Sequence, residues 1–114
     1  ILATSGDKDC IRQACERLEI RQYFTELLFC SEVGAGKDRP DIYLEAARKM
    51  NCRPDEALVV EDALHAIETA KKAGFSTVAV YDKANKEQEK IRETADIYLK
   101  SFNEQLAEMI TGRM

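Results

Sequence analysis

Hydrophobic residues along this chain form short continuous runs that alternate with segments of helical periodicity. The clearest run is Ala57-Leu-Val-Val60, which is followed directly by Glu61 and Asp62. A continuous apolar run is typical of a parallel strand covered on both faces, whereas a strand with one solvated face alternates apolar and polar residues. The segment from Ala63 to Ala73 has helical spacing and ends before Gly74, a residue type favoured just after a helix C-terminus. The pattern therefore predicts a buried strand, an acidic strand end and a helix.

The same alternation continues along the rest of the chain. The pattern predicts further strands at residues 1–4, 27–30, 76–80 and 97–99. It predicts further helices after Asp7 (with Ile11, Ala14, Cys15 and Leu18 at helical spacing), from Pro40 to about Met50 (with Tyr43, Ala47 and Met50 on one side), and over residues 86–94 and 103–110. Strands that alternate with helices indicate a parallel sheet with helices on both faces and right-handed crossovers. We therefore expect an α/β fold, a Rossmann-like three-layer sandwich, that occupies residues 1–114 as part of one domain.

Composition narrows the classes of function. The chain of 114 residues is 45% hydrophobic and 33% charged, with a net charge of −4, and its basic residues are scattered among acids, so we expect no nucleic-acid surface. No apolar run approaches the roughly 20 residues that cross a bilayer, so we expect no membrane span. The four cysteines have no C-x-x-C spacing and the single histidine is His65, which argues against zinc. Reduced thiols in a cytoplasmic protein are the favoured interpretation.

Several strand ends carry polar residues that a parallel sheet can bring to one edge. Adjacent carboxylates such as Glu61 and Asp62 are costly to hold together unless a cation or proton satisfies them, and a hard divalent ion such as Mg²⁺ is the first hypothesis. Thr4, Ser5 and Gly6 offer a hydroxyl and backbone N–H groups to a phosphate, although the same turn can simply cap a helix. Lys37 can neutralise a phosphate, or it can be an ordinary loop lysine. Asp82 is interpreted as a turn or cap residue.

Thr4, Lys37 and Asp62, in this order, resemble the second, third and fourth motifs of the haloacid dehalogenase superfamily, and the likeness is greatest to its β-phosphoglucomutase-like phosphatases and mutases. Three segments carry the resemblance, and the first is Ile1-Leu-Ala-Thr-Ser-Gly6. The second, Gly36-Lys-Asp-Arg-Pro-Asp-Ile-Tyr-Leu-Glu-Ala-Ala47, is similar to the pattern G-K-P-x-P-D-x-F/Y. The third, residues 57–80, is similar to the pattern V-x-E-D-S-x-x-G-I-x-A-A-x-x-A-G-M. Two positions depart from that pattern, because Ala63 replaces a serine and Ala66 a glycine. The loss of the serine hydroxyl is expected to reduce metal affinity somewhat.

The resemblance implies a Mg²⁺-dependent phosphoryl transfer that proceeds through an aspartyl phosphate, on a small phosphorylated metabolite. It implies that Thr4 hydrogen-bonds the phosphoryl oxygens beside Ser5 and Gly6, and that Lys37 binds both the phosphoryl group and the nucleophilic carboxylate. It also implies that Asp62 is a metal ligand, with Glu61 as its acidic neighbour. These roles agree with phosphoryl-transfer chemistry, in which positioning and charge neutralisation dominate.

The first motif of the superfamily, D-x-D on an apolar strand, and its cap domain have no counterpart here. Asp7 and Asp9 imitate the D-x-D spacing but follow a turn, so we interpret Asp7 as a helix cap. Gly34-Ala-Gly-Lys37 imitates a phosphate-binding P-loop but has Ser31 in place of its first glycine and Asp38 after the lysine.

The resemblance implies that the central, nucleophile-bearing strand lies between the strands that end at Thr4 and Asp62. We therefore expect this chain to be the C-terminal part of the core, inactive alone, and completed by an N-terminal segment of the same protein or by another chain. The substrate, and the choice between phosphatase and mutase, stay open. One alternative is a non-catalytic α/β binding or assembly module. Another is a receiver-like signalling domain, which the order of the motifs disfavours.

Overall fold

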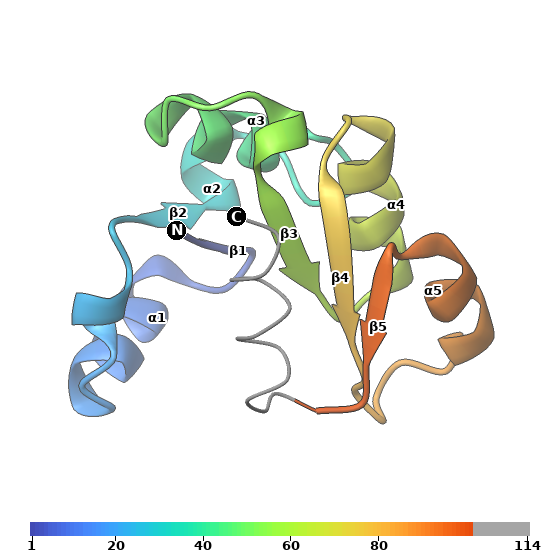
Figure 1. Ribbon diagram of the computed structural model, residues 1–114. Coiled ribbons are helices and arrows are strands. Elements are labelled where there is room, and N and C mark those ends of the chain that lie inside the picture. Colours follow the sequence, from blue (N-terminus) through green and yellow to red (C-terminus); the bar gives the residue numbers. More distant parts are fainter. Residues whose placement is uncertain (102–114) are drawn as a thin grey trace.

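The computed structural model describes residues 1–101, and the helix predicted over residues 103–110 lies outside this range. Strands and helices alternate along the chain as the hydrophobic pattern predicts (Figure 1). In chain order the elements are β1 (Leu2–Thr4), α1 (Lys8–Arg17), η1 (Arg21–Tyr23), β2 (Leu27–Phe29), α2 (Cys30–Val33), α3 (Asp41–Lys49), η2 (Pro54–Glu56), β3 (Leu58–Glu61), α4 (Leu64–Lys72), β4 (Ser76–Val80), α5 (Gln88–Thr94) and β5 (Ile97–Leu99), where η marks a 3₁₀ helix.

The strands form two parallel sheets rather than one. β1 pairs with β2 in one sheet, and the other sheet has the order β3-β4-β5 (Figure 1). Within residues 1–101 no strand pairs with the second edge of β1 or with the second edge of β3. The α/β class and the parallel pairing are confirmed, and the sheet is interrupted between β1 and β3, where the resemblance places the central strand.

The structure corrects two details of the sequence-based assignment. Cys30, predicted as the end of a strand, begins the short helix α2, and Gly34, with a φ of 85°, follows the last residue of this helix. Leu18, which shares the helical spacing of Ile11, Ala14 and Cys15, is 60% exposed, because it is the C-cap residue just beyond the last residue of α1. Met50 is 46% exposed, but it lines one surface hollow together with Tyr43, so the two residues lie on one side of α3 as predicted.

Helix α3 supplies the side chains that connect the two sheets. Ile42 and Tyr43 of α3 belong to one buried cluster with Leu28 of β2 and Phe75, which precedes β4. The rings of Tyr43 and Phe75 meet edge to face, with their centroids 6.1 Å apart. A second cluster joins α4, β4 and α5 through Ile67, Ala79 and Ile91. Side-chain packing thus joins the two sheets where strand pairing does not.

Candidate active site

Lys37 and Glu61 form an ion pair at the carboxyl end of β3. Glu61 is the last residue of this strand, and Lys37 follows α2 and the left-handed residue Gly34. The Lys37 Nζ and Glu61 Oε1 atoms lie 2.6 Å apart, and the two side chains are only 15% and 11% exposed. A pair that is this close and this shielded from water retains more of its electrostatic attraction than a surface pair. The predicted convergence of Lys37 on the acidic strand end is thus present, with Glu61 as its partner.

Asp62, the next residue, makes a different contact. The side-chain Nδ2 of Asn85 donates a hydrogen bond of 3.1 Å to Asp62 Oδ2 from the segment between β4 and α5. Ala63 is the N-cap of α4 and makes no side-chain cap hydrogen bond, as expected from the loss of the serine hydroxyl. The acidic pair is therefore divided between two partners, a lysine for Glu61 and an amide for Asp62.

Tyr43 lies beside this acidic pair. Its side chain is 3% exposed, and its hydroxyl has no hydrogen-bond partner within the described part of the chain. Burial raises the pKa of Tyr43, and the negative charge of Glu61 raises it further, so the hydroxyl stays protonated. Burial also raises the pKa of the Cys30 thiol, and the Lys37 ammonium group opposes this effect. The Tyr43 hydroxyl thus lies close to the Glu61 carboxylate without a hydrogen bond of regular geometry among the described residues.

The turn after β1 is built tightly around Thr4. The backbone N–H of Gly6 donates to Thr4 Oγ1 at 3.0 Å. A Cβ atom at Gly6 would come within 2.9 Å of Ile11 Cδ1, so a larger residue there would require the Ile11 side chain to shift. Asp7 then caps α1 by accepting a hydrogen bond from the backbone N–H of Cys10, and this bond lowers the pKa of Asp7. The interpretation of Asp7 as a helix cap is confirmed.

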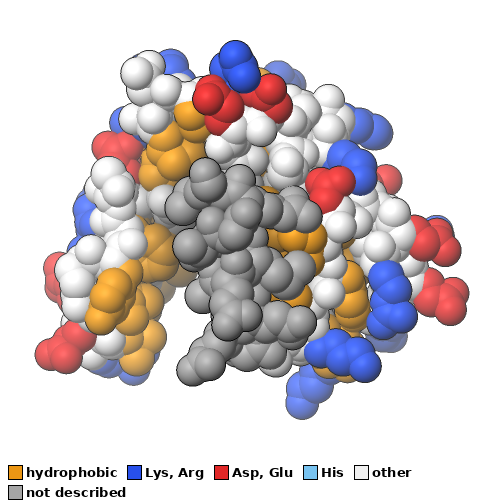
Figure 2. All heavy atoms as spheres, viewed as in Figure 1, with side chains coloured by type: hydrophobic (Ala, Val, Ile, Leu, Met, Phe, Trp, Pro, Cys, Tyr) orange, Lys and Arg blue, Asp and Glu red, His pale blue; other side chains and the backbone are white. Residues whose placement is uncertain are grey.

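An open hollow of about 390 Å³ lies between β1 and β3. Leu2 and Ala3 line it from one side, and Lys37, Val60, Glu61, Asp62, Val80, Tyr81 and Asp82 line the rest. A second hollow, of about 180 Å³, continues along the same two strands and includes Tyr43 in its wall. Figure 2 shows hydrophobic side chains at the surface on both the β1–β2 side and the β3–β4 side of this face. The structure thus gathers Lys37, Glu61 and Asp62 around one hollow, whereas Thr4, Ser5 and Gly6 are not among its lining residues.

The donors at this site match the chemistry of Mg²⁺ but do not complete a site for it. Carboxylate oxygens are the protein ligands that Mg²⁺ prefers, and the ion is commonly held by one or two of them. Among residues 1–101, no group of three or more His, Cys, Asp or Glu side chains is placed to hold a metal ion. Asp62 and Glu61 therefore fit as part of an ion site.

His65 is exposed on α4. None of the described helices is long and apolar enough to cross a membrane.

Comparisons with known proteins establish the family. The family described as haloacid dehalogenase-like hydrolase matches residues 1–80. A phosphorylated carbohydrates phosphatase of Thermotoga maritima is 34% identical over 77 residues, which cover 68% of this chain and 36% of that protein. A validoxylamine A 7'-phosphate phosphatase of Streptomyces hygroscopicus subsp. limoneus is 33% identical over 103 residues, which cover 90% of this chain and 47% of that protein. The chain belongs to the haloacid dehalogenase-like hydrolase family.

Solved structures agree with this assignment. A Thermotoga maritima protein assigned as a β-phosphoglucomutase has a TM-score of 0.82 and 27% sequence identity, and the match covers 99% of this chain and 52% of that one. The chain spans about half of that structure, and less than half of the two phosphatases above. The resemblance to the superfamily and the Rossmann-like fold are thus confirmed.

Two residues of the site were not found by sequence reasoning. Asn85 lies in a charged, turn-like segment without a hydrophobic pattern, and its only signal is a place just beyond the carboxyl end of β4. Tyr43 was assigned only to one side of its helix, together with Ala47 and Met50. Its position beside Glu61 depends on how α3 packs against β3, which helical periodicity does not report.

Proposed function

We propose that this chain carries the phosphate-binding and metal-binding part of an enzyme for Mg²⁺-dependent phosphoryl transfer on small phosphorylated metabolites. The observation that carries the proposal is the shielded Lys37–Glu61 ion pair next to Asp62 in the hollow between β1 and β3. Phosphoryl transfer requires positive charge close to the transferring group and acidic ligands for a cation. Both are present at the carboxyl end of a parallel strand, where ligands bind in open α/β sheets.

In this proposal Lys37 binds a phosphoryl oxygen and the nucleophilic carboxylate, and Thr4, with the backbone of Ser5 and Gly6, binds further phosphoryl oxygens. Asp62 is a Mg²⁺ ligand, and Glu61 sets the position of Lys37 and adds negative charge beside the ion. The bound ion would supply charge neutralisation for the transferring group.

The substrate class follows from the relatives. They include a phosphatase of phosphorylated carbohydrates and a phosphatase of validoxylamine A 7'-phosphate. A sugar phosphate or a similarly small phosphorylated metabolite is therefore the proposed substrate, and transfer by hydrolysis or by a mutase reaction is compatible with the same residues. We propose a cytoplasmic location, which the four free thiols support.

We further propose that a β-strand from an N-terminal segment of the same protein, or from another chain, occupies the space between β1 and β3 and brings the aspartate nucleophile. Three observations support this. β1 and β3 each pair on one edge only among the described residues, two hollows follow them, and the Tyr43 hydroxyl has no partner there. Unpaired strand edges attract another strand, and an inserted backbone would offer a carbonyl oxygen to Tyr43.

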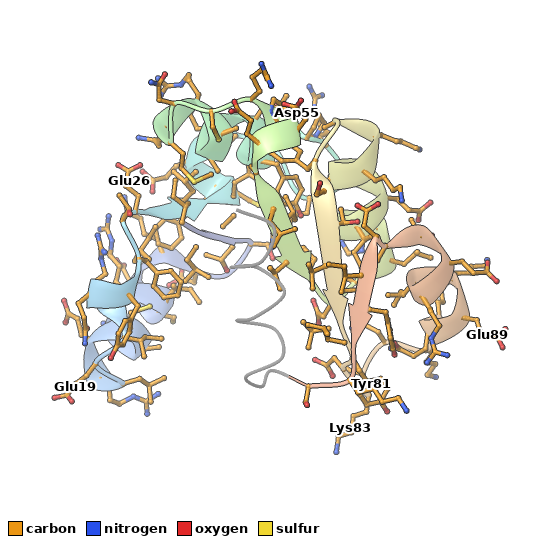
Figure 3. All side chains as sticks on the ribbon, viewed as in Figure 1. Glu19, Glu26, Asp55, Tyr81, Lys83 and Glu89 are labelled. Carbon is orange, nitrogen blue, oxygen red and sulfur yellow. The ribbon has the colours of Figure 1, made fainter. Side chains whose placement is uncertain are left out.

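The central test measures Mg²⁺-dependent hydrolysis of a sugar phosphate by the full-length protein and its variants. Asp62→Asn and Lys37→Ala are each expected to lower kcat/KM by about 10²-fold or more, because each removes a charge from the reacting centre. The matched controls are Asp55→Asn and Lys83→Ala, since Asp55 and Lys83 are exposed and lie near opposite ends of the molecule (Figure 3). Near wild-type turnover in either site variant would remove that residue from its proposed role.

The completing strand is tested separately. The 114-residue chain alone is expected to show no Mg²⁺-dependent phosphatase activity. A synthetic peptide with an apolar strand that ends in D-x-D-G-T/V is expected to bind it, to raise its melting temperature and to protect the backbone amides of β1 and β3 from hydrogen exchange. A peptide of scrambled order is the control. Activity of the chain alone would refute the requirement for this strand.

A further inference from the structure

The segment between β4 and α5 places one side chain against the acidic strand end. Residues 81–84, 86 and 87 are exposed, whereas Asn85 is half-buried. The Asn85 Nδ2 donates to Asp62 Oδ2 at 3.1 Å, across a sequence separation of 23 residues. Asp62 is itself part of the wall of the 390 Å³ hollow. A half-buried amide in an otherwise solvated turn is thus directed at one oxygen of one carboxylate.

The backbone around Asn85 is held in place by hydrogen bonds within the turn. The Asn85 backbone N–H donates to the Asp82 carbonyl oxygen at 3.0 Å, and the Ala84 N–H donates to Asp82 Oδ1 at 2.9 Å, which confirms Asp82 as a turn residue. The Gln88 side chain donates to the Asn85 carbonyl oxygen at 2.7 Å. These contacts leave the turn little freedom to move Asn85 away from Asp62.

The turn also contacts the sheet, through the side chain of Gln88. Gln88 Oε1 accepts a hydrogen bond of 2.7 Å from the Tyr98 hydroxyl of β5. The Arg92 guanidinium group lies 4.7 Å from the centre of the Tyr98 ring, a distance at which cation–π attraction is favourable. A continuous series of contacts therefore runs from β5 through Tyr98, Gln88 and Asn85 to Asp62.

We propose that Asn85 is a positioning residue for Asp62, which holds the carboxylate in one rotamer so that its other oxygen is available to a divalent cation in the hollow. This inference rests on the proposed function, in which Asp62 is the metal ligand. An amide N–H donor restricts the rotation of the carboxylate that accepts from it, and partners of this kind typically change metal affinity by about 10- to 100-fold.

The test measures Mn²⁺ affinity by electron paramagnetic resonance and the Mg²⁺ dependence of turnover, both on the full-length protein. Asn85→Leu removes the donor at similar size. Asn85→Ser keeps a turn-favouring residue whose side chain is too short to reach Asp62. Both are expected to weaken Mn²⁺ binding by about tenfold or more and to raise the Mg²⁺ concentration for half-maximal turnover in parallel. kcat at saturating Mg²⁺, substrate KM and the metal-free melting temperature are expected to change much less.

Two further variants separate the inference from the function on which it rests. Ala84→Ser, in the same turn, is the matched control and is expected to leave Mn²⁺ affinity within twofold of wild type. Asp62→Asn is expected to abolish the Mn²⁺ signal of the site. If Asp62→Asn leaves binding unchanged, the proposed role of Asp62 is wrong and the positioning role is wrong with it. If Asp62→Asn abolishes binding while both Asn85 variants stay within twofold of wild type, only the positioning role is overturned.

Discussion

Val60 and Val78 are neighbours in the same sheet, but they lie in very different surroundings. They are cross-strand partners in the parallel pairing of β3 with β4, and they are the same residue type. Val78 is fully buried, whereas Val60 is 38% exposed. The difference comes from the next strand, because Val78 has Ile97 of β5 on its other side and Val60 has no described strand beyond it.

This contrast shows where the molecule is complete and where it is open. The sheet is well packed from β4 to β5, and it is open at β3, beside the residues that carry the proposed chemistry. Lys37, Glu61 and Asp62 line the hollow at that open edge. Part of the surface that the site needs is thus the surface that a completing strand would cover.

The largest effect is expected from Val78→Ala. Removing two buried methyl groups from a fully covered position is expected to lower the free energy of unfolding by about 2–3 kcal/mol. Urea unfolding of the 114-residue chain measures this value. A cost below about 1 kcal/mol would mean that the β3-β4-β5 sheet is no better packed at its centre than at its open edge.

A smaller effect on the free energy of unfolding is expected from Asp96→Asn, which weakens hydrogen bonds between β4 and the residue that precedes β5. Asp96 Oδ2 accepts hydrogen bonds from the backbone N–H and the hydroxyl of the buried Thr77, at 2.8 Å and 3.1 Å, and Asp96 Oδ1 pairs with Lys71 at 3.2 Å. Because the carboxylate is partly exposed, solvent screens these contacts, and we expect a loss of about 1 kcal/mol at neutral pH.

The pH dependence of this loss has a definite sign. The Thr77 N–H, assisted by Lys71, lowers the pKa of Asp96 below its ordinary value of 3.8. A carboxyl group with a lowered pKa in the folded state stabilises the protein above its unfolded pKa, and this stabilisation is lost as the pH falls through the folded pKa. The difference between wild type and Asp96→Asn should therefore shrink below about pH 4. The exposed Asp55→Asn is the control, and a difference that grows on acidification would contradict the assignment.

The smallest effect is expected from Val60→Ala in the 114-residue chain, because the side chain is already partly in water. We expect a cost below about 1 kcal/mol in the free energy of unfolding. The same substitution in the full-length protein is expected to approach the cost of Val78→Ala, since a completing strand would bury Val60. Equal costs in the two forms would contradict the proposal that a strand enters between β1 and β3.

Local signals in the sequence were sufficient for most of the fold and for half of the site. Apolar runs predicted all the described strands, and Gly74 correctly marked the end of α4. Lys37, Glu61 and Asp62 were predicted to meet because strand ends of a parallel sheet share one edge. Leu18 is exposed although it continues the apolar spacing of its helix, because periodicity does not report where a helix stops. The interruption of the sheet was expected only from the resemblance to a family.

The order of residues alone therefore determines which segments become strands and which strands end in acids, because these properties depend on neighbours within one turn or one strand. It also places the chain in its family, through motifs that follow one another in a fixed order over residues 1–80. Tertiary structure alone decides that Glu61 pairs with Lys37 while Asp62 receives the amide of Asn85, and that the Tyr43 hydroxyl is left without a partner among the described residues. The physical reason is that these contacts join residues up to 24 positions apart. Their geometry depends on how helices and loops pack over the ends of the strands.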